Sequence, residues 1–168
     1  MKEYISVLDG CVLPENLPEM VVRALTEKKL TISAAESCTG GMFAKMVTDI
    51  PGSAVVIMES YVTYANIAKT KILGVKKETL DEFGAVSEQT VREMAQGLYK
   101  VSGSNVCAVF SGIAGPGGGT KEKPVGLVYT AVCFNGEITV YKLQLPGGRN
   151  DVRTQACLEI FNVINKMI

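Results

Sequence analysis

The chain has 168 residues, the length of one typical domain, with 47% hydrophobic and 20% charged residues, so a disordered protein is excluded. Seventeen basic residues balance seventeen acidic ones and no stretch is densely basic, which argues against a sequence-independent nucleic-acid binder. Histidine is absent, which excludes Ser–His–Asp and Cys–His catalysis and the histidine-based zinc-protease motif.

The cysteines and the N-terminus indicate the compartment. Five cysteines occur without a Cys-x-x-Cys pair, so the sequence predicts neither a disulfide framework nor a zinc site, and most of these thiols are read as small buried side chains. Residues 1–5 lack the long apolar run of a signal peptide, and no apolar stretch approaches the length of a membrane span. We therefore expect a cytoplasmic protein with neither a membrane nor a nucleic acid as partner.

The first half of the chain alternates predicted helices and strands after a short N-terminal arm over residues 1–14. Apolar residues at spacings of four, five and eight predict the first helix, and residues rich in valine, isoleucine and tyrosine predict a strand. The predicted elements are a helix over 17–29, a strand over 30–35, a helix over 42–47, a strand over 55–64 and short helices over 66–73 and 77–83.

The second half predicts a longer helix, three strands and a final helix. Ser87 is the expected N-cap of the longer helix, and Asn135-Gly136 is a strong signal for a two-residue hairpin turn. The predicted elements are a helix through 98, strands over 106–110, 125–134 and 138–145, and a helix from about 151. This alternation predicts a single α/β domain over 1–168, with a mostly parallel sheet and an antiparallel edge hairpin.

The first candidate site is the turn over residues 35–41, between a predicted buried strand and a helix. The carboxyl end of such a strand faces the crevice where α/β proteins bind ligands, and free backbone N–H groups there favour a phosphate or a developing oxyanion. In the alternative interpretation, Ser37 and Thr39 only cap the helix and the two glycines only permit a tight turn.

The second candidate site is the strand end that carries Tyr64 and, five residues later, Lys69. A lysine in a partly desolvated pocket has a lowered pKa and can act as a base toward a serine hydroxyl. The alternative is a solvated lysine on an exposed helix face.

Two further stretches could bind an anion. The run from Ser111 to Thr120 is rich in glycine, so its backbone N–H groups could form an anion-binding nest, although it matches neither the P-loop nor the dinucleotide fingerprint. Arg149 precedes the last helix and could clamp a phosphate or carboxylate, with Arg153 one helical turn further on. The alternatives are a structural turn and an arginine that serves only solubility.

Together these stretches resemble one family closely. The matching motifs are Ala35-Glu36-Ser37-Cys38-Thr39-Gly40-Gly41, Pro51-Gly52-Ser53, Val62-Thr63-Tyr64 with Asn66 and Lys69, Gly84-Ala85-Val86-Ser87, Gly112-Ile113-Ala114-Gly115-Pro116-Gly117-Gly118 and Pro124-Val125-Gly126. Over about residues 15–168 they resemble the CinA C-terminal domain, the PncC-type nicotinamide-mononucleotide amidohydrolase family, in its stand-alone form.

The resemblance implies a three-layer α/β/α fold, a homodimer, and a reaction without metal or cofactor. The implied reaction is hydrolysis of the carboxamide of nicotinamide mononucleotide (NMN) to nicotinic acid mononucleotide and ammonia, within pyridine-nucleotide recycling. Ser37 matches the family's nucleophile and Lys69 the lysine that activates it. The other residues expected at the site are Tyr64 in catalysis and Glu36, Thr39, Gly40, Tyr61, Ser111, Gly117, Gly118 and Arg149 in substrate binding.

Two departures from the family pattern concern the substrate pocket. The family usually has Thr where this chain has Ser111, and Asp where it has Gly148, so any carboxylate that orients Arg149 must come from elsewhere. One alternative function and one alternative nucleophile remain. One is a catalytically silent nucleotide-binding module linked to competence or DNA-damage response, and the other makes Cys38 the nucleophile.

Overall fold

The structure is a computed structural model that describes residues 4–168, so the first three residues of the predicted arm lie outside the described residues. The strands are Ile32–Glu36 (β1), Ile57–Val62 (β2), Val106–Gly112 (β3), Leu127–Phe134 (β4) and Glu137–Gln144 (β5). The helices are Leu17–Glu27 (α1), Met42–Thr48 (α2), Asn66–Leu73 (α3), Lys77–Phe83 (α4), Glu88–Ser102 (α5) and Arg149–Met167 (α6), with a 3-10 turn at Ser53–Val55 (η1).

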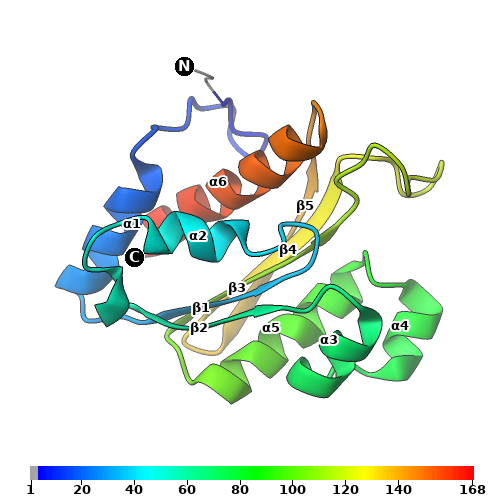
Figure 1. Cartoon of the computed structure of the whole chain (residues 1–168), viewed down its shortest axis with the longest axis horizontal. Helices are drawn as coiled ribbons and strands as arrows, with labels where there is room; N and C mark the ends of the chain where they lie inside the picture. Colours follow the sequence, from blue (N-terminus) through cyan, green and yellow to red (C-terminus); the bar gives the residue numbers. More distant parts are fainter. Residues whose placement is uncertain (1–3) are drawn as a thin grey trace.

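The five strands form one mixed sheet in the order β2-β1-β3-β4-β5. β1 pairs in parallel with β2 and β3, whereas β4 is antiparallel to both β3 and β5. α1, α2 and α6 cover one face of the sheet, and α3, α4 and α5 cover the other (Figure 1). The predicted three-layer α/β/α architecture, with its parallel strands and antiparallel edge hairpin, is confirmed.

Each face of the sheet has its own hydrophobic core, because the central strands are apolar on both sides. On the α6 side, the rings of Phe43 and Phe161 stack with centroids 4.3 Å apart, and Phe110 lies 5.2 Å from Phe43. On the α5 side, Met94 and Leu98 pack against β3 and β4 and are fully buried. These two cores hold the sheet rigid between its helical layers.

Local signals placed several elements correctly. The helices predicted over 66–73 and 77–83 have those bounds in the structure, and the first ends at Gly74, whose φ of 69° suits a glycine. The Ser87 hydroxyl oxygen accepts the backbone N–H of Thr90, which confirms the predicted N-cap. Asn135 and Gly136 both have positive φ, as the predicted hairpin turn requires.

Several predicted boundaries were wrong by one or more residues, and three of these differences have a clear structural cause. The first strand starts two residues later than expected, because the Leu30 N–H still donates to Leu25 O at the end of α1. The second strand is shorter than 55–64, since η1 occupies its expected start. The last helix begins at Arg149 rather than 151, because the Asp151 carboxylate accepts the N–H of Gly148 and so caps the helix from within its first turn.

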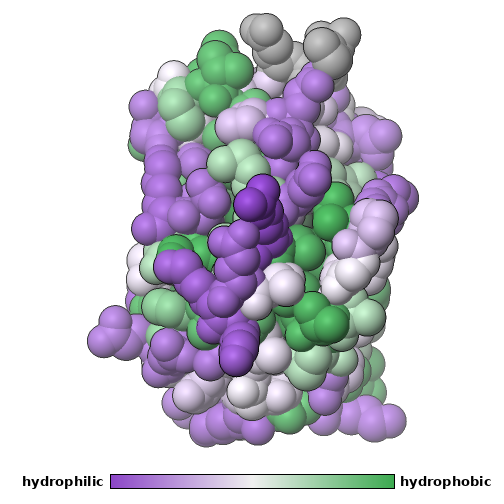
Figure 2. Space-filling view, turned by 90° about the vertical axis from the view of Figure 1, so that its left-hand side faces the viewer, coloured by the Kyte–Doolittle hydropathy of each residue, from purple (hydrophilic) through white to green (hydrophobic). Residues whose placement is uncertain are grey.

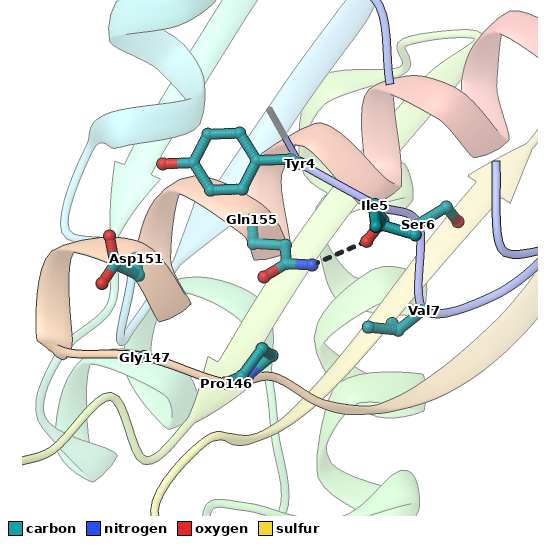
Figure 3. Close-up of a pocket in the computed structure, with 8 residues that line it drawn as sticks. All are labelled: Tyr4, Ile5, Ser6, Val7, Pro146, Gly147, Asp151 and Gln155. Carbon is teal, nitrogen blue, oxygen red and sulfur yellow. Dashed lines mark hydrogen bonds between the residues drawn. The ribbon is translucent and has the colours of Figure 1, made fainter. Parts of the chain in front are cut away.

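The described part of the N-terminal arm is tied to α6. A bridge between Ile5 and Val12 closes a small loop, and the Ser6 hydroxyl donates to the buried carboxylate of Glu159 at 2.9 Å. The Gln155 side-chain amide donates to Ile5 O at 2.9 Å, and a groove of about 470 Å³ lies between the arm and the start of α6 (Figure 3). None of the predicted site residues lines this groove.

The surface carries mixed polarity. On the side drawn in Figure 2, hydrophilic residues run through the centre and hydrophobic residues form small separate groups. Among residues 4–168, no helix has the length and apolarity needed to cross a bilayer.

Candidate active site

Ser37 lies at the edge of the sheet where the three parallel strands end. Its N–H donates to Phe110 O in β3 at 3.0 Å, and on the other side the N–H of Thr63 donates to Glu36 O at 2.8 Å. Ser37 therefore continues β1 by one residue between the ends of β2 and β3. This is the carboxyl edge at which α/β sheets place their ligands.

Lys69 reaches Ser37 from the first turns of α3. Its side chain is fully buried, so the alternative of a solvated lysine is wrong. The Nζ atom lies 3.2 Å from the Ser37 Oγ and donates to the carbonyl oxygens of Thr63 at 2.7 Å and Tyr64 at 3.2 Å. The structure therefore brings together two residues that are 32 positions apart in the sequence.

The environment of Lys69 shifts its protonation equilibrium toward the neutral amine. Burial lowers the pKa of the Lys69 ammonium below its usual value, because the charged form loses its hydration. In the neutral amine, two N–H bonds suffice for the carbonyl oxygens of Thr63 and Tyr64, and the lone pair is then free to accept the Ser37 hydroxyl proton. The pair thus has the geometry of a nucleophile and its base.

The turn that follows Ser37 holds two unused backbone donors. The N–H of Gly40 donates to Ser37 O at 3.1 Å, and the N–H of Gly41 donates to the Glu36 carboxylate at 3.0 Å. Within residues 4–168, the N–H groups of Cys38 and Thr39 donate to no backbone carbonyl of another residue, and the N–H of Cys38 faces its own thiol. Adjacent free N–H groups directly after a candidate nucleophile are suited to stabilise an oxyanion.

Of the three residues of this turn that the sequence places at the substrate, Glu36 and Thr39 are buried and Gly40 is exposed. The fully buried Glu36 carboxylate accepts backbone N–H groups at the start of α2. The Thr39 carbonyl accepts the Arg153 Nη2 at 2.6 Å, and its buried hydroxyl has no partner in the described part of the chain. A Cβ atom on Gly40 would lie 3.3 Å from the same guanidinium nitrogen.

A second group of predicted residues meets where α6 begins. The Arg149 Nη1 donates to Gly115 O at 2.8 Å, and its Nη2 lies 3.5 Å from the Tyr64 hydroxyl. Both side chains are exposed. Gly117 and Gly118 follow in the same exposed loop, so the phenol, the guanidinium and the glycine-rich loop form one rim beside the Ser37–Lys69 pair.

The side chains of Ser111 and Tyr61 take different positions relative to the carboxyl edge of the sheet, where Ser37 lies. Ser111 is buried near the end of β3, one residue beyond the Phe110 carbonyl that holds Ser37, and its hydroxyl donates to Ala85 O at 2.7 Å. Tyr61 is half-buried on β2, and its hydroxyl donates to Glu59, two residues back along the strand. The Tyr61 hydroxyl is therefore directed away from the edge where Ser37 lies.

The structure also shows how Arg149 is oriented without the family's aspartate at position 148, and it argues against Cys38 as the nucleophile. With glycine at position 148, Arg149 takes its orientation from the Gly115 carbonyl, so that no neighbouring carboxylate is needed for this contact. Burial raises the pKa of the Cys38 thiol to about 12, which opposes formation of the thiolate that a cysteine nucleophile requires.

Sequence reasoning missed the carbonyl oxygens of Thr63 and Gly115 and the position of Arg153. The carbonyl oxygens have no side-chain signature, and only the parallel register of β1 and β2 could have placed Thr63 beside Ser37. Arg153 was expected beside Arg149, but it contacts Thr39, 114 residues away in the sequence.

Comparison with known proteins identifies relatives over nearly the whole chain. The family model for the CinA C-terminal domain matches residues 14–168. A CinA-like protein of Kosmotoga olearia is 49% identical over 154 residues, which are 92% of this chain and 37% of that protein. The chain thus spans little more than a third of the length of such curated relatives.

Solved structures share the fold. A competence/damage inducible protein of Agrobacterium tumefaciens is 41% identical with a TM-score of 0.84, covering 91% of this chain and 98% of that one. A competence-damaged protein (CinA) superfamily protein of Klebsiella pneumoniae is 33% identical with a TM-score of 0.87, covering 90% and 94% of the two chains.

Proposed function

The chain belongs to the CinA C-terminal domain family, and from this premise we propose that it is a serine–lysine amidohydrolase that converts NMN to nicotinic acid mononucleotide and ammonia. The observation that carries the proposal is the contact of 3.2 Å between the Ser37 Oγ and the buried Lys69 Nζ. A site that only bound a nucleotide would not need a desolvated amine against a serine hydroxyl.

The first half of the proposed reaction forms an acyl-enzyme. The neutral Lys69 amine takes the proton of the Ser37 hydroxyl as its Oγ attacks the carboxamide carbon of NMN. The amide oxygen becomes an oxyanion that the N–H groups of Cys38 and Thr39 stabilise. The Lys69 ammonium then gives its proton to the amide nitrogen, so the C–N bond breaks and ammonia leaves.

The second half restores the enzyme. A water molecule attacks the ester carbon while Lys69 accepts one of its protons. The second tetrahedral intermediate collapses when Lys69 returns that proton to the Ser37 Oγ, which releases nicotinic acid mononucleotide. Lys69 thus carries one proton in each half of the reaction, first from Ser37 to the leaving nitrogen and then from water to Ser37, without a histidine.

The rim formed by Tyr64, Arg149 and the loop at Gly115 supports a role in holding the ribose phosphate. Arg149 keeps guanidinium N–H groups beyond its bond to Gly115 O, and guanidinium is suited to bind phosphate. We expect the protein to act in the cytoplasm as a homodimer on this small-molecule substrate.

Ammonia release from NMN by the purified protein tests the proposal. Ser37→Ala is expected to abolish turnover, whereas Ser60→Ala, which changes an exposed serine on β2, should leave the rate unchanged. Circular dichroism confirms that each variant is folded.

Two outcomes would overturn the proposal. A folded wild-type protein that releases no ammonia from NMN or related nicotinamides would make the site a nucleotide-binding module. Activity that survives Ser37→Ala but is lost in Cys38→Ala would transfer the nucleophile to the cysteine.

A further inference from the structure

The Ser37–Gly41 turn is held by two charged side chains that do not belong to the Ser37–Lys69 pair. Glu36 precedes the turn in the chain and Arg153 approaches it from α6. We propose that Glu36 and Arg153 are positioning residues that fix this turn, so that the N–H groups of Cys38 and Thr39 meet the oxyanion. This inference rests on the amidohydrolase function proposed above.

The Glu36 carboxylate ties the end of β1 to the start of α2. Its Oε2 accepts the N–H of Gly41 at 3.0 Å and of Phe43 at 3.1 Å, and its Oε1 accepts the N–H of Ala44 at 2.9 Å. The side chain is fully buried, and backbone hydrogen bonds to a carboxylate are stronger than those between neutral groups. The Glu36 side chain therefore holds the end of β1 against the start of α2.

Arg153 holds the middle of the same turn. Its Nη2 donates to Thr39 O at 2.6 Å, which fixes the plane of the peptide that follows Thr39. Gly40 has a φ of 60° and lies so close to this nitrogen that an added Cβ would be 3.3 Å from it. The buried Arg153 Nε has no hydrogen-bond partner among the described residues, whereas the Nη2 of the same guanidinium donates to Thr39 O.

Together the two side chains constrain the segment that carries the free donors. Glu36 fixes both ends of the segment and Arg153 fixes the carbonyl next to the Thr39 N–H. An oxyanion donor acts only within hydrogen-bond distance of the developing charge, and a displacement of about 1 Å can cost about 10²-fold in rate. Loss of either contact is therefore expected to lower kcat and to leave substrate affinity largely intact.

Glu36→Gln is the sharpest test. The amide keeps the volume of the side chain, but its NH₂ group must face at least one of the three backbone N–H donors, so at most two of the bonds survive. We expect kcat for NMN to fall about 10²-fold while KM changes little. Glu27→Gln, an exposed glutamate paired with Arg23, is the matched control and should keep the wild-type rate.

Arg153 provides a second test that does not depend on folding of the Glu36 variant. Arg153→Met removes the donor to Thr39, whereas Arg153→Lys keeps a donor of similar reach. Rescue of kcat by lysine, with methionine impaired, supports a positioning role. Arg92→Met, which changes an exposed arginine on α5, is the control.

Labelling of Ser37 by a fluorophosphonate separates this inference from the choice of substrate. The probe reacts at the serine, and its phosphoryl oxygen uses the same N–H donors as an oxyanion. We expect rapid labelling of the wild type and slow labelling of Glu36→Gln and Arg153→Met, even if NMN is not hydrolysed. Wild-type labelling rates and wild-type kcat in the folded variants would show that the two residues are merely structural. A wild-type protein whose Ser37 resists the probe would overturn this inference and the nucleophile assignment together.

Discussion

Replacement of Lys69 by methionine is expected to make the difference in stability between variant and wild type depend on pH. Burial lowers the pKa of Lys69 below its usual 10.5, while the unfolded chain keeps the usual value. Between the two pKa values the unfolded state binds the extra proton, so the stability of the wild type rises as pH rises through that window. Methionine does not titrate, and the variant loses this contribution.

Two effects set the size of the difference. The variant leaves the carbonyl oxygens of Thr63 and Tyr64 without their donor, at a cost of about 1–3 kcal/mol each, and this cost does not change with pH. Against it, methionine removes the desolvation of the ammonium, a gain of about 1.4 kcal/mol for every pH unit between the two pKa values. This gain is complete below the folded-state pKa and vanishes near pH 10.5.

Urea unfolding of both proteins, followed by circular dichroism at pH 7 and pH 10, measures the difference. Lys69→Met should be relatively more destabilised at pH 10 than at pH 7, and its ammonia release from NMN should fall by about 10²- to 10⁴-fold through loss of the base. The wild-type rate should rise with pH as the Lys69 amine becomes neutral. A difference in unfolding free energy that is equal at the two pH values would refute the reasoning, because Lys69 would then not titrate with a lowered pKa.

Two further predictions concern the core and the thiols. Phe161→Ala should lower the free energy of unfolding by about 3–5 kcal/mol, because it opens a cavity beside the stacked ring of Phe43, and a loss below 1 kcal/mol in urea unfolding would contradict that packing. An alkylating reagent at pH 8 should modify the exposed Cys11 and spare the buried Cys38, whose pKa of about 12 keeps it protonated; rapid modification of Cys38, measured by mass spectrometry, would argue against this burial.

The sequence predicted the fold well where signals were local. Gly74 marked the end of α3, Ser87 marked the start of α5 and Asn135-Gly136 marked the hairpin, because each needs a backbone geometry that few residues adopt. The start of α6 was misplaced since its capping carboxylate, Asp151, lies inside the helix rather than before it.

The site was predicted in part. The turn after β1 was recognised from its position in the chain, but the residues left Lys69 open as either a base or a solvated side chain, and the resemblance favoured the base. The local pattern did not show that Glu36 and Thr39 point inward, because a turn with two positive-φ glycines no longer alternates its side chains as a strand does. The contact of Arg153 with Thr39 depends on tertiary packing and has no local signal.

The position of α6 after both Ser37 and Lys69 in the chain has a consequence for synthesis. Its 19 residues supply Ile160, Phe161 and Ile164 to one face of the sheet and Arg153 to the turn after β1. A nascent polypeptide that lacks this helix exposes the apolar face of its sheet and leaves the turn after β1 without the contact between Arg153 and Thr39. On the ribosome, Ser37 and Lys69 are made before α6, so we expect the proposed activity to appear only when this helix has emerged and docked.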